Sequence, residues 1–184
     1  EGQSFVHAGG ETFESTDPAT GEVVAELGAA TPDTIDAAVA SGVRAFETSD
    51  WGSNGELRAR VLYGFAQAMR ANEERLAELL TREQGKTIHE SLIEVRSSAK
   101  MTEYYAGLAR AVYGRSALLG ANVTGVVLRE PVGVVAVITP WNWPLVLLVR
   151  SLAPALAAGN ATVVKPASIT PALTRSSKWP VATL

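Results

Sequence analysis

The fold of this chain is decided by residues 131–144, which read PVGVVAVITPWNWP. Val132–Thr139 is a nearly unbroken β-branched run, as expected of a strand covered on both faces. After a proline-rich turn, Leu145–Ala158 predicts a helix that ends at Gly159, and Ala161–Lys165 predicts a second buried strand. Strand, helix and strand at this close spacing predict a βαβ crossover and therefore a parallel sheet.

Upstream of this unit the sequence predicts four helices. The first begins at Pro32, because Thr31 is a good N-cap and proline suits the first helical position. Its apolar residues recur at helical spacing and predict one buried face, formed by Ile35, Val39, Val43 and Phe46. The other three helices are predicted from about Glu56, from Asn72 to Gly85, and over Ile88–Arg110.

Outside these four helices and the βαβ unit, the sequence predicts little regular structure. The first thirty residues are polar and rich in turn residues, with one strand-like stretch at Glu22–Leu27. Arg115–Leu119 and Val123–Arg129 flank a Gly-Ala-Asn turn and predict a β-hairpin. Thr170-Pro171 predicts the start of one more helix near the end of the chain. The fold class is thus α/β, with a helical N-terminal portion and one βαβ unit of an incomplete Rossmann-like parallel sheet.

The composition excludes several classes of function. The 184 residues are 47% hydrophobic, and 16 basic against 19 acidic residues give a net charge of −3. No basic excess is available to bind nucleic acid or an anionic membrane surface. Cysteine is absent, and the two histidines lie far apart at His7 and His89, so we expect no disulfide and no metal site. No secretory signal is evident, which favours a cytoplasmic protein.

Three local patterns are better explained without function. The uncharged stretch 131–149 is long enough to cross a bilayer, but Pro140, Asn142 and Pro144 at its centre favour a buried strand, a turn and a helix. Gly85-Lys86-Thr87 resembles the end of a phosphate-binding loop, yet it lacks the preceding glycine and follows a helix. The basic residues of the first three helices are interspersed with acids and predict a solvated face: Arg44, Arg58, Arg60, Arg70 and Arg75.

The candidate site lies where the two parallel strands end. Ligands of open α/β sheets bind outside the carboxyl ends of the strands. Asn142 follows the first strand in a turn stiffened by two prolines, and Lys165 ends the second. The amide can donate two hydrogen bonds to a ligand oxygen, and the ammonium suits an anionic or hydroxyl-bearing ligand. The alternative is that Asn142 satisfies backbone groups of its own turn and Lys165 extends into solvent.

Five motifs in order resemble the NAD(P)-dependent aldehyde dehydrogenases. They are EPVGVV from Glu130, PWNWPL from Pro140, APALAAGN from Ala153, VKPAS from Val164, and Thr170-Pro171. The resemblance extends back to about Thr16 and covers most of the chain. It implies an enzyme that oxidises an aldehyde to a carboxylic acid with NAD or NADP.

The resemblance also implies roles for single residues. Asn142 matches the amide of the oxyanion hole, Trp141 lies beside the nicotinamide, and Trp143 lines the substrate tunnel. The cofactor-binding residues would be Thr139, Trp141, Asn142, Lys165, Pro166, Ala167 and Ser168. Many members carry a glutamate for the ribose 2′-hydroxyl where this chain has Ser168. Because a carboxylate would repel a 2′-phosphate and a hydroxyl would not, we expect NADP to be used at least as well as NAD.

Arg150 is a candidate substrate residue. It resembles in position the arginine that holds the substrate carboxylate in succinate-semialdehyde dehydrogenases. Similar arginines occur in relatives that act on aromatic aldehydes, and an arginine that shields a helix flank would explain the residue equally well. The substrate therefore stays open between a semialdehyde, an aromatic aldehyde and another aldehyde.

The resemblance divides the chain into three parts. Residues 1–113 match the N-terminal helical part of the cofactor-binding domain, residues 114–130 a hairpin arm toward the oligomerisation region, and residues 131–184 the start of the NAD(P)-binding sheet. The arm implies a homodimer or homotetramer.

The family's cysteine nucleophile and glutamate base are missing, so we expect the 184 residues alone to be inactive. The tail from Thr174 keeps no helical stripe and resembles a frameshift or premature stop. The alternative function is a non-catalytic module that associates with other subunits.

Overall fold

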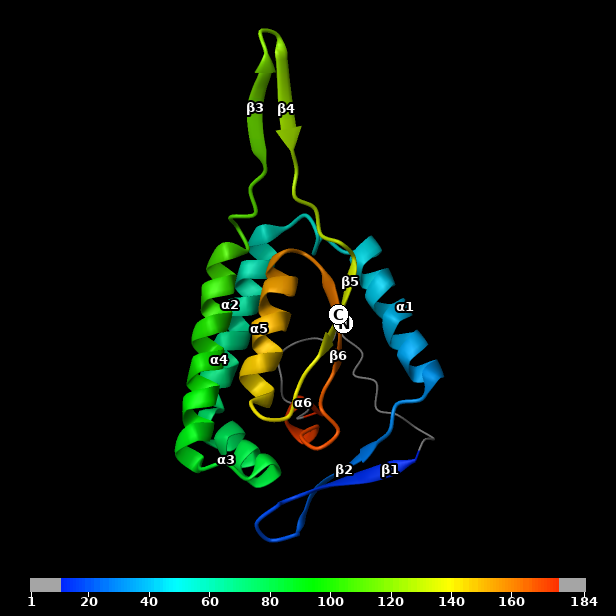
Figure 1. Ribbon diagram of the computed structural model, residues 1–184, viewed down its shortest axis with the longest axis vertical. Helices are drawn as coiled ribbons and strands as arrows, with labels where there is room; N and C mark the ends of the chain where they lie inside the picture. Colours follow the sequence, from blue (N-terminus) through cyan, green and yellow to red (C-terminus); the bar gives the residue numbers. More distant parts are fainter. Residues whose placement is uncertain (1–10, 176–184) are drawn as a thin grey trace.

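The computed structural model describes residues 11–175, and its elements surround one short parallel sheet (Figure 1). Helices α2, α4 and α5 lie side by side on one side of the sheet, and α1 lies on the other. In chain order the elements are β1 (Thr12–Thr16), β2 (Val23–Gly28), α1 (Pro32–Thr48), α2 (Gly55–Ala71), α3 (Glu73–Gln84), α4 (Ile88–Leu108), β3 (Arg115–Gly120), β4 (Val123–Val127), β5 (Val134–Ile138), α5 (Pro144–Ala157), β6 (Ala161–Lys165) and α6 (Ala172–Arg175). The tail residues 176–184 and His7 lie outside the described range.

The predicted βαβ unit is confirmed. Strands β5 and β6 are parallel, in a register that runs from Val134 opposite Ala161 to Ile138 opposite Lys165, and α5 connects them. The side chain of Asn160 fixes the start of the unit, because its Oδ1 accepts hydrogen bonds from the Val132 and Gly133 amides at 2.7 and 3.2 Å. Within residues 11–175, β6 pairs with no strand other than β5.

The core is formed mainly by α2, α4 and α5. Leucine, valine and alanine side chains from these helices interdigitate, and small residues on α4 let the other two helices approach closely. The fully buried members include Leu62, Met69, Val95, Ala99, Leu145 and Val149. The helix predicted over Ile88–Arg110 is confirmed as α4, and apolar and small residues at helical spacing from Leu92 to Ala106 face the core, whereas Ile88 at its start is exposed. This packing holds α5, and with it the turn that precedes α5.

The buried face predicted for α1 is wrong for Ile35, Val39 and Val43, which are exposed, whereas Phe46 is partly buried. The Thr31 cap is present, but Ile35 and Val39 are 52% and 42% exposed. Gly42 faces the sheet instead, and a Cβ at that position would lie 3.1 Å from Val134. Close approach of the helix to the sheet needs a small residue, so α1 packs against the sheet through the side that carries Gly42. The α1 side of β5 is covered only near Val134, and Ile138 is exposed rather than covered on both faces.

A strand that the sequence did not predict lies at the start of the described chain. Strand β1 pairs antiparallel with β2, so these residues are not only turns. Buried Ser15 of β1 donates a hydrogen bond to Glu83 at 3.0 Å, and the same carboxylate accepts the Ala172 and Leu173 amides of α6. Burial raises the pKa of Glu83 above its ordinary value. Glu83 therefore joins β1, α3 and α6.

Arg58 corrects the prediction of a solvated basic face. Its side chain is buried, and its guanidinium donates hydrogen bonds to four backbone carbonyls. The acceptors are Trp51 at 2.6 Å, Gly52 and Ala157 at 2.9 Å, and Ala109 at 3.2 Å. Burial lowers the pKa of Arg58 from its ordinary value. Arg58 thus ties the start of α2 to the C-terminal ends of α4 and α5.

The predicted hairpin is confirmed as β3 and β4, which project away from the body of the molecule (Figure 1). No helix within residues 11–175 is both long enough and apolar enough to cross a membrane. The uncharged stretch 131–149 is divided instead between β5, a turn and α5.

Candidate functional site

The candidate site is the turn from Thr139 to Trp143, between β5 and α5. Thr139 is buried, and its amide donates a hydrogen bond to the Lys165 carbonyl at 3.1 Å, which continues the sheet ladder into the turn. Asn142 is exposed, and its side-chain amide has no hydrogen-bond partner within residues 11–175. The structure therefore does not support the alternative that this amide satisfies backbone groups of its own turn. The amide is available to a ligand.

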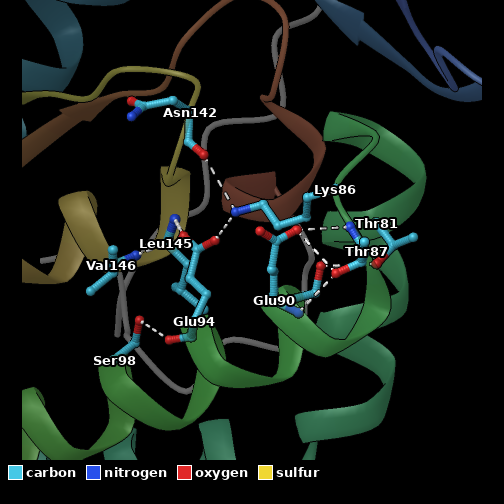
Figure 2. Close-up of polar contacts among 10 residues, drawn as sticks. Thr81, Lys86, Thr87, Glu90, Glu94, Ser98, Asn142, Leu145 and Val146 are labelled. Carbon is cyan, nitrogen blue, oxygen red and sulfur yellow. Dashed lines mark hydrogen bonds and ion pairs between the residues drawn. The ribbon is translucent and has the colours of Figure 1, made fainter.

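The first turn of α5 is capped by a residue from another helix. Trp143 occupies the N-cap position and makes no side-chain cap, and Pro144 has no N–H to donate. Oε1 of Glu94 from α4 accepts the Leu145 amide at 2.8 Å and the Val146 amide at 3.0 Å (Figure 2). Glu94 is completely buried. A carboxylate here also complements the positive end of the α5 dipole.

Lys86 completes this arrangement from the loop between α3 and α4. Its ammonium forms an ion pair with Oε2 of Glu94, lies 3.4 Å from the Asn142 carbonyl oxygen and lies 4.2 Å from the centre of the Trp143 ring. Two local features define the path of this loop: Gly85 has a left-handed φ of 82°, and Thr87 forms a capping box with Glu90. The Gly-Lys-Thr sequence therefore directs its lysine to a buried carboxylate.

A small polar pocket opens beside the turn. Its volume is about 120 Å³, and it is lined by Gln84, Lys86, Glu90, Asn142 and Trp143. Figure 2 shows the Asn142 side chain pointing away from Lys86, while its carbonyl points toward the lysine. The backbone of Asn142 is thus held on one side, and its amide group is presented on the other.

The second group of predicted site residues lies at the end of β6. Because Ile138 pairs with Lys165, this lysine lies at the same sheet edge as Thr139, as predicted. Its Nζ donates to the Pro166 carbonyl at 3.0 Å and has two further N–H groups to donate. Ser168 is exposed, and Pro166 and Ala167 are partly buried. An exposed ammonium and hydroxyl at this edge fit the hydroxyl and phosphate groups of a dinucleotide.

The remaining predicted residues are less closely associated with the turn. Trp141 is half-exposed, and Trp143 is partly buried against Lys86. Arg150 lies in α5 with its side chain exposed, and it has no hydrogen bond or ion pair to any described residue. The structure brings Asn142, Trp143 and Thr139 together and leaves Arg150 as a free cation on the helix.

Sequence reasoning did not identify Glu94 or the role of Lys86. A partial signal was present in α4, where several small polar residues lie on the same side of the helix as Glu94. Ser91, Ser98 and Thr102 share the buried side of the helix, and two of their hydroxyls donate to backbone carbonyls of the same helix. A carboxylate on the side of a helix that carries small polar residues favours a buried charge, although the same pattern contains the exposed Glu90 one turn earlier.

Comparison with known proteins agrees with this architecture. The family model described as "Aldehyde dehydrogenase family" matches residues 5–176. Mitochondrial succinate-semialdehyde dehydrogenase of Arabidopsis thaliana is 40% identical over 88% of the chain and 30% of the relative. A betaine aldehyde dehydrogenase of Vibrio vulnificus is 40% identical over 92% of the chain and 35% of the relative. The structure of an NAD-dependent aldehyde dehydrogenase from Sinorhizobium meliloti superposes with a TM-score of 0.92 at 34% identity, over 97% of this chain and 36% of the other.

Proposed function

The chain belongs to the aldehyde dehydrogenase family, and on that premise we propose that it forms the N-terminal part of an oxidoreductase that converts an aldehyde to a carboxylic acid with NAD(P)⁺. The chain spans about a third of the length of the curated relatives it matches. The observation that carries the proposal is the Asn142 turn. An amide without an internal partner is presented at the carboxyl end of β5, where ligands of such sheets bind.

Asn142 would act on the oxygen of the aldehyde. When a nucleophile adds to the carbonyl carbon, a new bond forms to that carbon and the π electrons move to the oxygen, which becomes negative. The amide of Asn142 can donate a hydrogen bond to this oxygen more strongly than to the neutral carbonyl, which lowers the barrier. The 184 residues contain no cysteine, so the nucleophile would come from another part of the protein.

The residues at the end of β6 would bind the cofactor. Lys165 and Ser168 are exposed there and can donate hydrogen bonds to ribose hydroxyls or to a phosphate. When bound, NAD(P)⁺ supplies the hydride acceptor of the oxidation. The Lys-Pro-Ala-Ser segment contains no carboxylate side chain that would repel a 2′-phosphate. This supports use of NADP at least as well as NAD.

The overall proposal is tested by the coding DNA that follows this segment. We expect one of the three reading frames to continue into a sequence with a cysteine and the rest of the sheet. The product of that longer frame should form NAD(P)H from an aldehyde, and the 184-residue chain alone should not. A following sequence without such a continuation would favour the non-catalytic module, and NAD(P)H formation by the short chain would contradict the assignment of the nucleophile to another part.

Replacing Ser168 by glutamate should shift cofactor preference toward NAD. A carboxylate beside Lys165 would repel a 2′-phosphate and accept a hydrogen bond from a 2′-hydroxyl. We expect the ratio of kcat/KM for NADP to that for NAD to fall by about tenfold or more, the effect of about one charged hydrogen bond. Ser168→Ala, which removes the hydroxyl without adding charge, is the control. A strong NAD preference in the unaltered enzyme would overturn the NADP proposal.

Arg150 is proposed to bind a carboxylate on the substrate. Its exposed guanidinium has no partner among the described residues, so it is free to accept one. Arg150→Ala should then lower kcat/KM for a carboxylated aldehyde by about 10- to 100-fold, the usual range for a charged hydrogen bond. An uncharged aldehyde of equal length is the control and should lose little. If kcat/KM for the carboxylated aldehyde is the same before and after the substitution, Arg150 does not bind the substrate carboxylate and only shields the flank of its helix.

The hairpin of β3 and β4 is proposed to form a subunit contact in a homodimer or homotetramer. Leucine and valine side chains are exposed along it, including Leu118 at 80%. Such a surface is typical of an interaction site. Leu118→Glu should shift the longer protein toward smaller species in sedimentation velocity. Ile35→Glu, which adds the same charge at an exposed apolar residue of α1, should not, and an unchanged assembly in both variants would place the contact elsewhere.

A further inference from the structure

Glu94 and Lys86 hold the backbone that directly follows the Asn142 side chain, where the turn enters α5, and we infer that they are positioning residues for the Asn142 amide. The inference rests on the proposed function of Asn142. Lys86 contacts the carbonyl of Asn142, and Glu94 binds the amides of Leu145 and Val146 just after it. The backbone from the Asn142 carbonyl to the first turn of α5 is thus held by one buried ion pair (Figure 2).

The turn has no comparable support of its own. Two prolines remove backbone N–H groups at positions 140 and 144, and the Trp143 side chain does not cap α5. The first free amides of α5 would be buried without an acceptor if Glu94 were absent, because Leu145 is fully buried. The orientation of the peptide that carries Asn142 therefore depends on a residue of α4, 51 positions away from Leu145.

The charges of the pair also favour a role beyond packing. The Glu94 side chain has no exposed surface and that of Lys86 is 7% exposed, so both charges are removed from water. Such pairs are often no more stabilising than apolar residues of similar size. Lys86 does something an apolar residue could not, since its ammonium pairs with Glu94 and also contacts the carbonyl oxygen of Asn142. The pair holds the turn without adding net negative charge to it.

The first test follows the turn itself in the full 184-residue chain. Glu94→Gln keeps an oxygen for the two amides but removes the charge, and charged hydrogen bonds are about twice as strong as neutral ones. We expect hydrogen exchange at Leu145 and Val146 to accelerate by about tenfold, and the side-chain NH₂ resonances of Asn142 in NMR spectra to shift. Glu103→Gln is the matched control, because Glu103 also lies in α4 and pairs with an arginine, Arg70, far from the turn.

A second variant covers the case in which Glu94→Gln does not fold. Lys86→Met combined with Glu94→Gln removes both charges and leaves no buried charge unpaired. It should also shift the Asn142 resonances, because the contact with the Asn142 carbonyl is lost. If the resonances of Asn142 and the exchange of Leu145 and Val146 match the unaltered chain in every variant that folds, the inference is wrong.

The second test asks whether Glu94 acts through Asn142, with kinetics of the longer, active product. Glu94→Gln should lower kcat by about 10- to 100-fold with little change in KM, as expected when a donor to the transition state is misplaced. In an Asn142→Ala background the same change should have almost no further effect on kcat. An equal loss in both backgrounds would show a merely structural role and overturn the inference. If the longer product has no dehydrogenase activity, the proposed function fails, and the exchange experiment still decides on the positioning of the turn.

Discussion

Replacing Asn142 by alanine is expected to lower kcat of the longer, active enzyme by about 10²- to 10³-fold, the usual cost of removing one donor from an oxyanion site. The amide is exposed at the end of β5 and has no partner within the described residues, so its hydrogen bonds are available to the reacting oxygen. KM for the aldehyde should change much less, because the interaction strengthens only as charge develops. Steady-state kinetics at saturating cofactor measure both quantities.

Protein stability provides the control for this substitution. Because the Asn142 side chain is exposed and unbonded, the free energy of unfolding should stay within about 0.5 kcal/mol of the unaltered value. Asn142→Asp keeps the size of the side chain but has no N–H to donate, so it should be as slow as alanine. An aspartate variant that retains full kcat would remove Asn142 from the oxyanion role.

Replacing Arg58 by methionine is expected to destabilise the 184-residue chain by on the order of 3 kcal/mol or more, since each buried carbonyl left without a donor costs about 1–3 kcal/mol. Arg58 donates hydrogen bonds to the carbonyls of Gly52, Ala109 and Ala157, which belong to three separate segments of the chain. Methionine fills a similar volume but cannot replace these bonds. Denaturant unfolding followed by circular dichroism measures the change in the free energy of unfolding.

Two further variants separate the hydrogen bonds from the charge. Arg60→Ala removes an exposed arginine of the same helix and should change stability by no more than about 0.5 kcal/mol. Arg58→Lys keeps the charge but cannot reach several carbonyls at once, so it should lie much closer to the methionine variant than to the unaltered chain. If Arg58→Lys is as stable as the unaltered chain, the positive charge of Arg58, and not its hydrogen bonds to several carbonyls, stabilises the fold.

The sheet edge of the candidate site could be predicted from local patterns. The β-branched run before Pro140 and the short apolar strand before Pro166 are separated by one helix, and this spacing allows only a parallel crossover. Parallel strands end at the same edge, so Asn142 and Lys165 had to share it. The turn after β5 was predictable for the same reason, because prolines on both sides of Trp141 to Trp143 exclude a continuous helix.

The α1 helix shows where the periodic pattern failed. The pattern identified the helix and its cap, but it assigned the buried side to the largest apolar residues. The side of Gly42 allows a closer approach to Val134 than the side of Val39 and Val43 does. Hydrophobic periodicity shows which residues of a helix are apolar. The distance at which the helix packs against its neighbour decides which of these residues are buried.

The sequence by itself determined the βαβ unit, its turn and the two polar residues at the sheet edge, because these depend on propensity and spacing within a short segment. Only the tertiary structure decided the fate of the charges on the helices. Lys86 and Arg58 look like solvated side chains in their own loop and helix, and the small polar residues near Glu94 do not show what would pair with it; all three side chains are buried by elements distant in the sequence. A charged side chain can stay buried when hydrogen-bonding or oppositely charged groups from distant parts of the chain contact it. The local sequence does not show those groups.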